Sequence, residues 1–234
     1  MSVVEVAGLR YEYPGGEVAL DGVSFAIEDG ERVALLGPNG SGKTTLVLSL
    51  LGVLAPADGT VRVRGEVMDE EHAFELRRHL GLVFQDPNDQ LFMPTVRDDV
   101  AFGPSNYGVS GDELEEVVDR ALERVGGAHL AKRAPHHLSG GERRRVAIAG
   151  VLAMDPSALI MDEPSSGLDP AGMREITDLL GDLDQTLLLV THHLDLAERL
   201  CDRALVLDRG RLVHDGPLAD VLANPAFLAE HRLA

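Results

Sequence analysis

The 234-residue sequence is poor in several residue types, and each shortage narrows the classes of protein that it can encode. Cys201 is the only cysteine, so no disulfide can form within the chain and no zinc site can be built from cysteines. The longest uncharged apolar run, at residues 146–154, is shorter than the ~20 residues of a membrane-spanning helix. The first residues lack the basic segment and apolar run of a signal peptide. We therefore expect a protein of a reducing compartment that does not itself cross a membrane.

Basic residues are also scarce. The chain has 21 of them against 39 acidic residues, a formal net charge of −18, and Lys43 and Lys132 are its only lysines. A nucleic-acid partner is disfavoured, because binding to a phosphate backbone needs a basic face that releases counterions. The 44% hydrophobic and 26% charged residues are typical of a globular protein and exclude a disordered, collagen-like or coiled-coil chain.

The first part of the chain is rich in strand patterns. Apolar and β-branched runs at residues 3–9, 18–27 and 32–36 are separated by short turns that contain glycine. Connections this short favour an antiparallel arrangement. The run at 32–36 also leads into a glycine-rich turn and a helical pattern, which makes it the start of a strand-loop-helix unit.

Later strand patterns alternate with helical ones. The strands are expected at residues 82–84, 158–161 and 187–190, and a hairpin over residues 204–207 and 211–214 follows them. Alternation of strands and helices predicts a parallel sheet covered by helices. The fold class is therefore α/β.

A mostly helical segment, residues 87–152, interrupts this alternation. Ser110 and Glu113 form a capping-box pattern ahead of apolar residues at helical spacing. We therefore divide the single domain of residues 1–234 into a core, residues 1–86 plus 153–234, and an inserted helical subdomain.

The glycine-rich turn after the strand at 32–36 has the pattern of a phosphate-binding loop. Such a loop contains Gly, four further residues and then Gly-Lys-Thr. Its backbone N–H groups and the positive end of the following helix face phosphate oxygens, while Lys43 supplies a cation and Thr44 a hydroxyl for Mg²⁺. The alternative is a structural glycine turn with an incidental lysine, which the position between a strand and a helix disfavours. The predicted phosphate-binding residues are Gly37, Pro38, Asn39, Gly40, Ser41, Gly42, Lys43, Thr44 and Thr45.

Two carboxylates follow the apolar strand at residues 158–161. Asp162 can hold the Mg²⁺ that Thr44 also contacts, and Glu163 can orient or deprotonate an attacking water. The structural alternative is a helix-capping pair before Pro164. In combination with the loop at residues 37–44, the pair indicates a magnesium-dependent hydrolytic site.

A third motif, Leu138-Ser139-Gly140-Gly141-Glu142, precedes a helical pattern. Ser139 and Glu142 have the spacing of a capping box. Glycines at the first two helical positions cost backbone entropy, which indicates a helix N-terminus left open for an anion. Both interpretations are compatible, and together they predict a second phosphate-binding surface.

Two histidine pairs and an arginine run have competing interpretations. His136-His137 and His192-His193 raise the possibility of a metal site, but adjacent residues on a strand or helix point apart, so we expect none. The arginines at residues 143–145 could bind nucleic acid. Among so many acidic residues, we interpret them as a solvated or interface surface.

The three motifs, in this order and spacing, resemble those of the nucleotide-binding subunit of ATP-binding cassette (ABC) transporters, and the resemblance covers residues 3–216. It implies a P-loop NTPase (RecA-like) core with a mainly parallel sheet, an N-terminal antiparallel β part and an inserted α-helical subdomain. It also implies an ATPase that uses Mg²⁺. Two nucleotides would lie in a homodimer, or in a heterodimer with a paralogous ATPase, each between the loop of one subunit and the signature of the other.

The resemblance assigns roles to further residues. Tyr13 falls where the family has an aromatic that stacks on adenine, Gln85 matches the glutamine that reaches Mg²⁺ and the attacking water, and His192 matches the histidine that contacts the γ-phosphate. The sequence departs from the family's usual residues at Glu142, where Gln is commoner, and at His193, where Asp is usual. The resemblance implies that Glu163, His192 and Gln85 are catalytic and that Thr44, Gln85 and Asp162 bind Mg²⁺. The signature consists of Ser139, Gly140, Gly141 and Glu142, and the loop that crosses to the partner consists of Ser166, Gly167, Leu168 and Asp169.

Residues 85–92 and 95–104 are similar to the energy-coupling-factor branch, which serves cobalt, nickel and vitamin uptake. This implies a peripheral protein at the cytoplasmic face of the cell membrane, bound to an integral membrane permease, with no nucleic acid as partner. The alternatives are an ABC importer or exporter ATPase for another substrate, a soluble ABC ATPase of DNA repair or translation, and a non-enzymatic nucleotide sensor. The single cassette disfavours a soluble ABC ATPase of DNA repair or translation. The presence of Glu163 and His192 disfavours a non-enzymatic nucleotide sensor.

Overall fold

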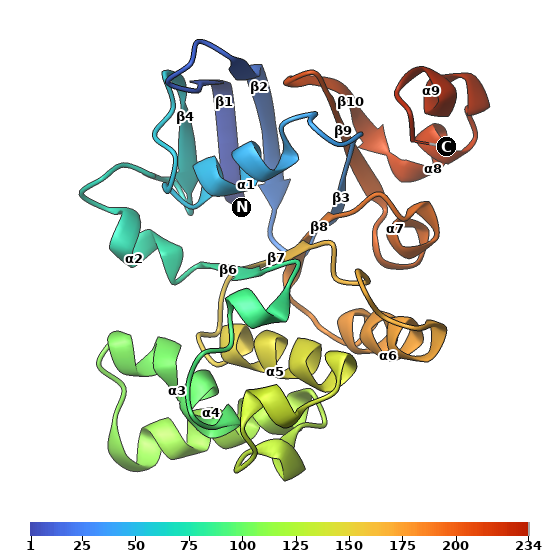
Figure 1. Cartoon of the computed structure of the whole chain (residues 1–234). Coiled ribbons are helices and arrows are strands. Elements are labelled where there is room, and N and C mark those ends of the chain that lie inside the picture. The colour runs from blue at the N-terminus through green and yellow to red at the C-terminus, as the bar shows by residue number, and fades with distance from the viewer. Residues whose placement is uncertain (234) are drawn as a thin grey trace.

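The computed structural model describes residues 1–233 and arranges them around two β-sheets (Figure 1). The first sheet is antiparallel, with strand order β2-β1-β4-β5, and the strands predicted at residues 3–9 and 18–27 belong to it. Two of its strands and one short helix lie in the segment 52–79, for which the sequence indicated no element. The bounds are β1 (Ser2–Glu12), β2 (Val18–Glu28), β4 (Asp58–Val63), β5 (Glu66–Val67) and α2 (Ala73–Arg77).

The second sheet has the order β10-β9-β3-β8-β7-β6, and all strands but the edge strand β10 run parallel. The run at residues 32–36 differs from the expected antiparallel arrangement, because β3 pairs in parallel with β8 and β9 at the centre of this sheet. The α/β fold with an antiparallel N-terminal part is confirmed. The bounds are β3 (Arg32–Leu36), β6 (Leu80–Val83), β7 (Ala158–Asp162), β8 (Thr186–Val190), β9 (Arg203–Asp208) and β10 (Arg211–Pro217).

Two hydrophobic cores lie on opposite faces of the parallel sheet. Val33 and Leu35 of β3 belong to the core shared with α1 and the antiparallel sheet. Ala34 and Leu36, which alternate with them, belong to the core shared with the remaining large helices. The helices of the core part are α1 (Lys43–Leu50), α6 (Pro170–Gly181), α7 (Leu194–Leu200), α8 (Leu218–Leu222) and α9 (Pro225–Glu230).

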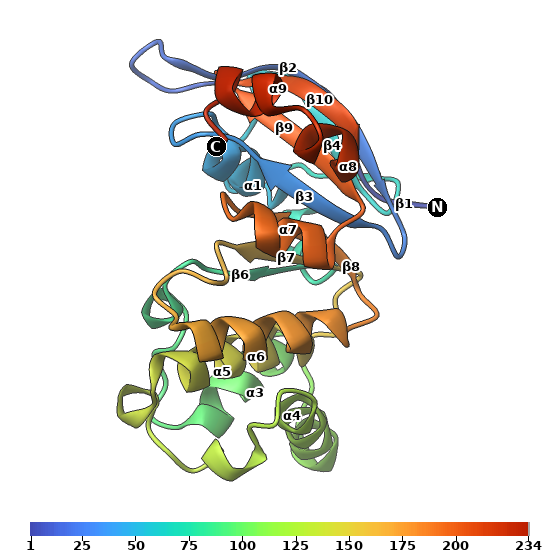
Figure 2. The same cartoon turned by 90° about the vertical axis from the view of Figure 1, so that its right-hand side faces the viewer.

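The chain between β6 and β7 is helical. Figure 2 shows α3, α4 and α5 at one end of the molecule, the antiparallel sheet at the other end and the parallel sheet between them. Ser110 precedes α4, but its side chain makes no capping bond, so the capping box predicted there is wrong. No helix in residues 1–233 is long and apolar enough to cross a bilayer. The bounds are η1 (Pro87–Asp89), α3 (Val96–Asn106), α4 (Gly111–Arg124), η2 (Ala128–Leu130), η3 (Pro135–His137) and α5 (Gly140–Leu152).

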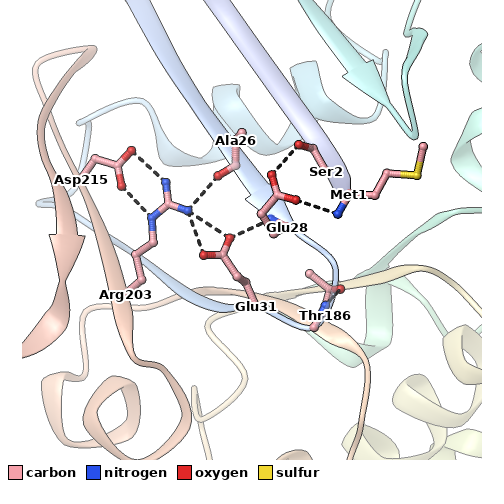
Figure 3. Close-up of polar contacts among 9 residues, drawn as sticks. Met1, Ser2, Ala26, Glu28, Glu31, Thr186, Arg203 and Asp215 are labelled. Carbon is pink, nitrogen blue, oxygen red and sulfur yellow. Dashed lines mark hydrogen bonds and ion pairs between the residues drawn. The ribbon is translucent and has the colours of Figure 1, made fainter.

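Arg203 links the two sheets (Figure 3). From β9 its guanidinium donates to both carboxylate oxygens of Asp215 on β10, at 2.7 and 2.9 Å, and to Glu31 at 3.0 Å. It also donates to the backbone oxygen of Ala26 on β2, at 2.8 Å. One planar group therefore connects β9 and β10 of the parallel sheet to β2 of the antiparallel sheet and to the turn that follows β2.

Candidate nucleotide-binding and hydrolytic site

The turn between β3 and α1 forms one wall of a cavity of about 500 Å³. Gly37 and Gly42 have φ values of 152° and 107°, which side-chain-bearing residues rarely adopt. A Cβ at Gly42 would lie 2.6 Å from the Ala19 oxygen, and one at Gly37 would lie 2.2 Å from the Leu207 oxygen. Helix α1 then begins at Lys43 with no side-chain cap, so its first N–H groups are available to an anion.

Lys43 lies across this loop. Its Nζ donates to the backbone oxygens of Gly37 at 2.6 Å and Pro38 at 3.1 Å. Burial lowers the pKa of Lys43, and the nearby charges of Glu163 and Asp162 act in the opposite direction. A cation from the loop therefore lies near the two carboxylates at the end of β7.

Asp162 is the last residue of β7 and lines the same cavity as Thr44 and Gln85. Burial raises the pKa of Asp162, the charge of Glu163 raises it further, and Lys43 and Arg144 lower it. A divalent cation beside Asp162 would offset the cost of burying its charge. A carboxylate, a hydroxyl and an amide oxygen are also ligands that suit Mg²⁺, so the residues present fit this ion.

Glu163 is held at both carboxylate oxygens. The Thr191 hydroxyl donates to Oε2 at 3.1 Å, and His192 Nδ1 lies 2.7 Å from Oε1. The backbone of Glu163 is in the left-handed region, with φ 45°, and its N–H donates to the Val190 oxygen at 2.8 Å. Strain of this kind persists only where surrounding contacts impose it. Thr191 and His192, which follow β8, thus fix the side chain of Glu163, which follows β7.

The two histidines after β8 lie side by side, contrary to expectation. The ring centroids of His192 and His193 are 4.2 Å apart with an interplanar angle of 36°. The alternation of a strand does not apply, because β8 ends at Val190 and His193 is the N-cap residue of α7. One ligand atom from each of Glu163, His192 and His193 lies within 4.8 Å of the other two. The prediction that these neighbouring imidazoles point apart is wrong.

Tyr13 lies at the edge of the cavity. Its hydroxyl is 3.0 Å from Thr45 Oγ1, its ring contacts Tyr11 edge to face, and 40% of its surface is exposed. The sequence did not indicate five further lining residues, because the hairpins that carry them are remote in sequence and no motif marks them. These are Glu17, Val18, Ala19, Arg209 and Gly210.

The signature segment lies apart from this cavity. Ser139 is the N-cap of α5, where its hydroxyl accepts from Glu142 N at 3.2 Å, and Glu142 Oε2 accepts from Ser139 N at 2.6 Å, so this capping box is confirmed. Apart from the adjacent residues and the backbone of the helix itself, no heavy atom of residues 1–233 lies within 4 Å of a Cβ built at Gly140 or Gly141, which leaves the start of the helix open. Within one chain, the signature and the phosphate-binding loop do not form a common cavity.

A hollow of about 400 Å³ lies beside the signature, lined by Gly140, Gln85 and the loop that begins at Ser166. Gln85 Nε2 lies 3.4 Å from Ser166 Oγ. Asp169 accepts from Gly172 N at 2.7 Å and is the N-cap of α6, with Pro170 at the first helical position. Gly167 and Leu168 line the same hollow.

Arg144 corrects the interpretation of the arginine run. It is 1% exposed and donates to backbone oxygens of Phe84 and Gln85, whereas the run was predicted to be a solvated or interface surface. On α5 it shares a buried face with Ala147, Ile148 and Val151, at helical spacing. That periodicity is the signal in the sequence that could have identified it.

Comparisons with known proteins agree with this geometry. The sequence profile of the ABC transporter family matches residues 20–166. An ABC transporter ATP-binding protein of Streptomyces coelicolor is 57% identical over 98% of this chain and 88% of its own length. The energy-coupling factor transporter ATP-binding protein of Methanoculleus marisnigri is 44% identical over 100% of this chain and 86% of its own length.

Two solved structures are similar over almost the whole chain. The protein cbiO1 from Clostridium perfringens, part of the ABC transporter complex cbiONQ, superposes with a TM-score of 0.87 at 39% identity and covers 99% of this chain and 95% of that one. The ATP-binding cassette MJ0796, a dimer in a post-hydrolysis state bound to ADP and Pi, gives a TM-score of 0.80 at 29% identity over 92% and 98% of the two chains. With its phosphate-binding loop, its strand-end carboxylates and these relatives, the chain belongs to the ABC transporter family as an ATP-hydrolysing subunit.

Proposed function

We propose that this ATPase drives import of a transition-metal ion, cobalt or nickel, or of a vitamin, through an energy-coupling-factor type complex. Support comes from the relative named as an energy-coupling factor ATP-binding protein and from the structural likeness to cbiO1. The sequence similarity of residues 85–92 and 95–104 to that branch favours the same assignment. The competing candidate is the ATPase of an ABC importer or exporter for another substrate.

The hydrolytic chemistry follows from the residues around the cavity. We assign the triphosphate to the loop at residues 37–45, the adenine to Tyr13, and Mg²⁺ to Thr44, Gln85 and Asp162. When bound, Mg²⁺ would neutralise charge on the β- and γ-phosphates. Glu163, fixed by Thr191 and His192, would accept a proton from the attacking water as the bond between the γ-phosphorus and its bridging oxygen breaks. The products are ADP and phosphate.

We assign the signature segment, residues 138–142, to the nucleotide of a second subunit. Its helix start is open and lies away from the chain's own cavity, so it can complete a site only in another copy or a close paralogue. The loop from Ser166 to Asp169 would cross to that partner. The dimeric cassette bound to ADP and Pi is a precedent for two such chains acting together.

A third surface suits an integral membrane permease. A hollow of about 330 Å³ between β6 and α3 is lined by Phe84, Phe92 and Phe102, whose exposed fractions are 41%, 63% and 43%. Exposed aromatic side chains gathered in one groove are typical of a site for an apolar helix face. In the family this groove takes the coupling helix of the membrane subunit, and such docking would place the chain at the cytoplasmic face of the membrane.

The observation that carries the assignment of catalysis is the Glu163 carboxylate, held between Thr191 and His192 at the cavity. We expect Glu163→Gln to retain ATP binding and to lower turnover by at least ~10². Phosphate release and nucleotide affinity of the purified full chain measure the two effects separately. Near-normal turnover in the variant would reject the assigned role.

Transport is tested by the partner. Affinity purification of the tagged chain from detergent-solubilised cells should recover an integral membrane protein, and Phe92→Ser should reduce that recovery while the ATPase activity of the isolated chain is retained. Recovery of ribosomes or DNA instead would favour the soluble ABC ATPases. The transported substrate is identified by uptake of radioactive cobalt, nickel or vitamin in cells that lack this chain.

A further inference from the structure

We propose that Arg144 is a positioning residue that joins the permease groove to the hydrolytic site through the signature helix α5. The inference rests on the proposed function, because it gives the groove and Gln85 their roles. Arg144 lines neither the cavity assigned to the nucleotide nor the groove assigned to the permease, although it lines the hollow beside the signature. It acts through the backbone of the segments that line the cavity and the groove.

The contacts of Arg144 define this role. Its two terminal nitrogens donate to the Phe84 and Gln85 oxygens, each at 2.6 Å, and the second also lies 3.4 Å from the Ser166 oxygen. Phe84 lines the groove, Gln85 lines the hydrolytic cavity, and Ser166 begins the loop toward the partner. One guanidinium thus contacts the backbone of three functional segments.

Gln90 holds the same strand end from the other side. Its Oε1 accepts from Phe84 N at 3.3 Å, and its Nε2 donates to the Ala147 oxygen of α5 at 2.9 Å. Both backbone polar groups of Phe84 are therefore connected to α5, one through Arg144 and the other through Gln90. A displacement of Phe84 by a docked helix cannot occur without moving α5 or breaking these bonds.

The charge of Arg144 argues against a purely stabilising role. Its side chain is withdrawn from water, and the acidic groups near it are Asp86 and Asp162 rather than a bonded ion-pair partner. A buried charge is weak evidence for stability, because an apolar residue of similar volume often serves as well. The planar fork supplies geometry instead: it spaces two acceptors in a fixed arrangement that a lysine ammonium cannot reproduce.

The consequence for catalysis is specific. Without Arg144, Gln85 keeps its side chain but loses the bond that fixes its backbone relative to α5. Arg144 makes its hydrogen bonds to Phe84, Gln85 and Ser166 and does not line the cavity formed by the loop at residues 37–45 and Tyr13, so binding of ATP should be nearly unaffected. Turnover requires Gln85 and the signature to be correctly positioned relative to each other, so kcat should fall. Displacement of a positioned group by ~1 Å can lower a rate by ~10²-fold.

The test compares Arg144→Met and Arg144→Lys with Arg120→Met in the full-length chain. Arg120 is a matched control on α4 of the same subdomain, where it is exposed and its one ion pair within residues 1–233 is with Glu116, at 3.9 Å. We expect Arg144→Met to lower kcat by ~10- to 100-fold with ATP affinity within about threefold, Arg144→Lys to recover part of the loss, and Arg120→Met to match the parent.

Amide hydrogen exchange supplies a readout that does not depend on turnover. In Arg144→Met, exchange should accelerate in residues 84–90 and 165–168 and remain unchanged in β3 and α1. Uniform acceleration over the whole chain, a normal kcat, or equal losses of kcat and ATP affinity would each overturn the proposal. A parent chain that hydrolyses no ATP would refute the proposed function, whereas the exchange pattern would still test the role of Arg144.

Discussion

His192 Nδ1 lies 2.7 Å from Glu163 Oε1, and because a carboxylate can only accept, this nitrogen carries the proton of the bond. The imidazole therefore holds one oxygen of the predicted base, and the Thr191 hydroxyl holds the other at 3.1 Å. The two bonds differ in what they add to catalysis. The His192 side chain is 60% exposed, whereas Thr191 is fully buried, so only His192 can also contact a bound group.

We expect His192→Ala to lower kcat by ~10²- to 10³-fold, the usual cost of removing one stabilising group from a phosphoryl or acyl transfer site. Thr191→Val keeps the volume of the side chain and removes two hydrogen bonds, the one donated to Glu163 and the one accepted from His193 N. The decrease in kcat should therefore be smaller than in His192→Ala. Steady-state phosphate release measures both. A larger effect of Thr191→Val than of His192→Ala would contradict the assigned roles.

Asp162→Asn should stabilise the chain in the absence of nucleotide while abolishing Mg²⁺-dependent hydrolysis. Burial raises the pKa of Asp162, so its ionised form opposes folding. We expect the melting temperature to rise by about 2–4 °C at neutral pH, which corresponds to ~1 kcal/mol in a chain of this size. Calorimetry measures it, with Asp155→Asn, at an exposed position after the end of α5, as the control.

The increase in melting temperature expected for Asp162→Asn should depend on pH in a defined direction. A carboxyl whose pKa is raised by folding destabilises the native state above the raised pKa, and the effect fades as pH falls toward its ordinary value of 3.8. The melting temperatures of Asp162→Asn and the parent should therefore differ more at about pH 8 than at about pH 5. A gap that widens on acidification would show that burial of this charge is not the cause.

Gly42→Ala should damage both folding and nucleotide binding. Its φ is 107°, and an added Cβ would lie 2.6 Å from the Ala19 oxygen, so strain and a backbone clash combine. We expect the melting temperature to fall by roughly 5–10 °C. Gly40→Ala is the matched control, because Gly40 also has a positive φ, 78°, but faces open space. Equal effects of the two substitutions would show that the clash is unimportant.

Cys201 should be inert in the folded chain. Burial raises the pKa of its thiol to about 12, so at about pH 8 roughly one molecule in ten thousand carries the reactive thiolate. Ellman's reagent should label the native protein slowly and the guanidinium-unfolded protein at once. Rapid labelling of the native chain would mean that the region of α7 and β9 opens locally far more often than its packing implies.

The sequence predicted the hydrolytic motifs because each is local. The loop at residues 37–44, the carboxylates after β7 and the capping box of Ser139 and Glu142 all depend on contacts within a few residues. The ends of parallel strands meet at one sheet edge, so Gln85, Asp162 and Glu163 could be placed together without coordinates. Their catalytic roles remain predictions.

What the sequence did not predict depends on distant partners. Arg144 was misinterpreted because the run of three arginines was judged by its charge and not by the helical spacing that places Arg144 on the buried face of α5. Its acceptors, backbone oxygens some 60 residues away in the chain, could not be predicted. The cavity wall at Arg209 and Gly210 arises from a hairpin whose Gly210 N donates to the Ser41 oxygen at 2.9 Å. No local pattern in the sequence indicates the acceptors of Arg144 or the contact between Gly210 and Ser41.

Strand β3 contributes side chains to both hydrophobic cores. Val33 and Leu35 face one core, and Ala34 and Leu36 face the other. Heat should therefore melt both layers in a single endotherm rather than in two, since neither interior keeps its boundary once this strand leaves the sheet. Crowding at Ala34 by a larger side chain should lower the temperature of that one transition without splitting it.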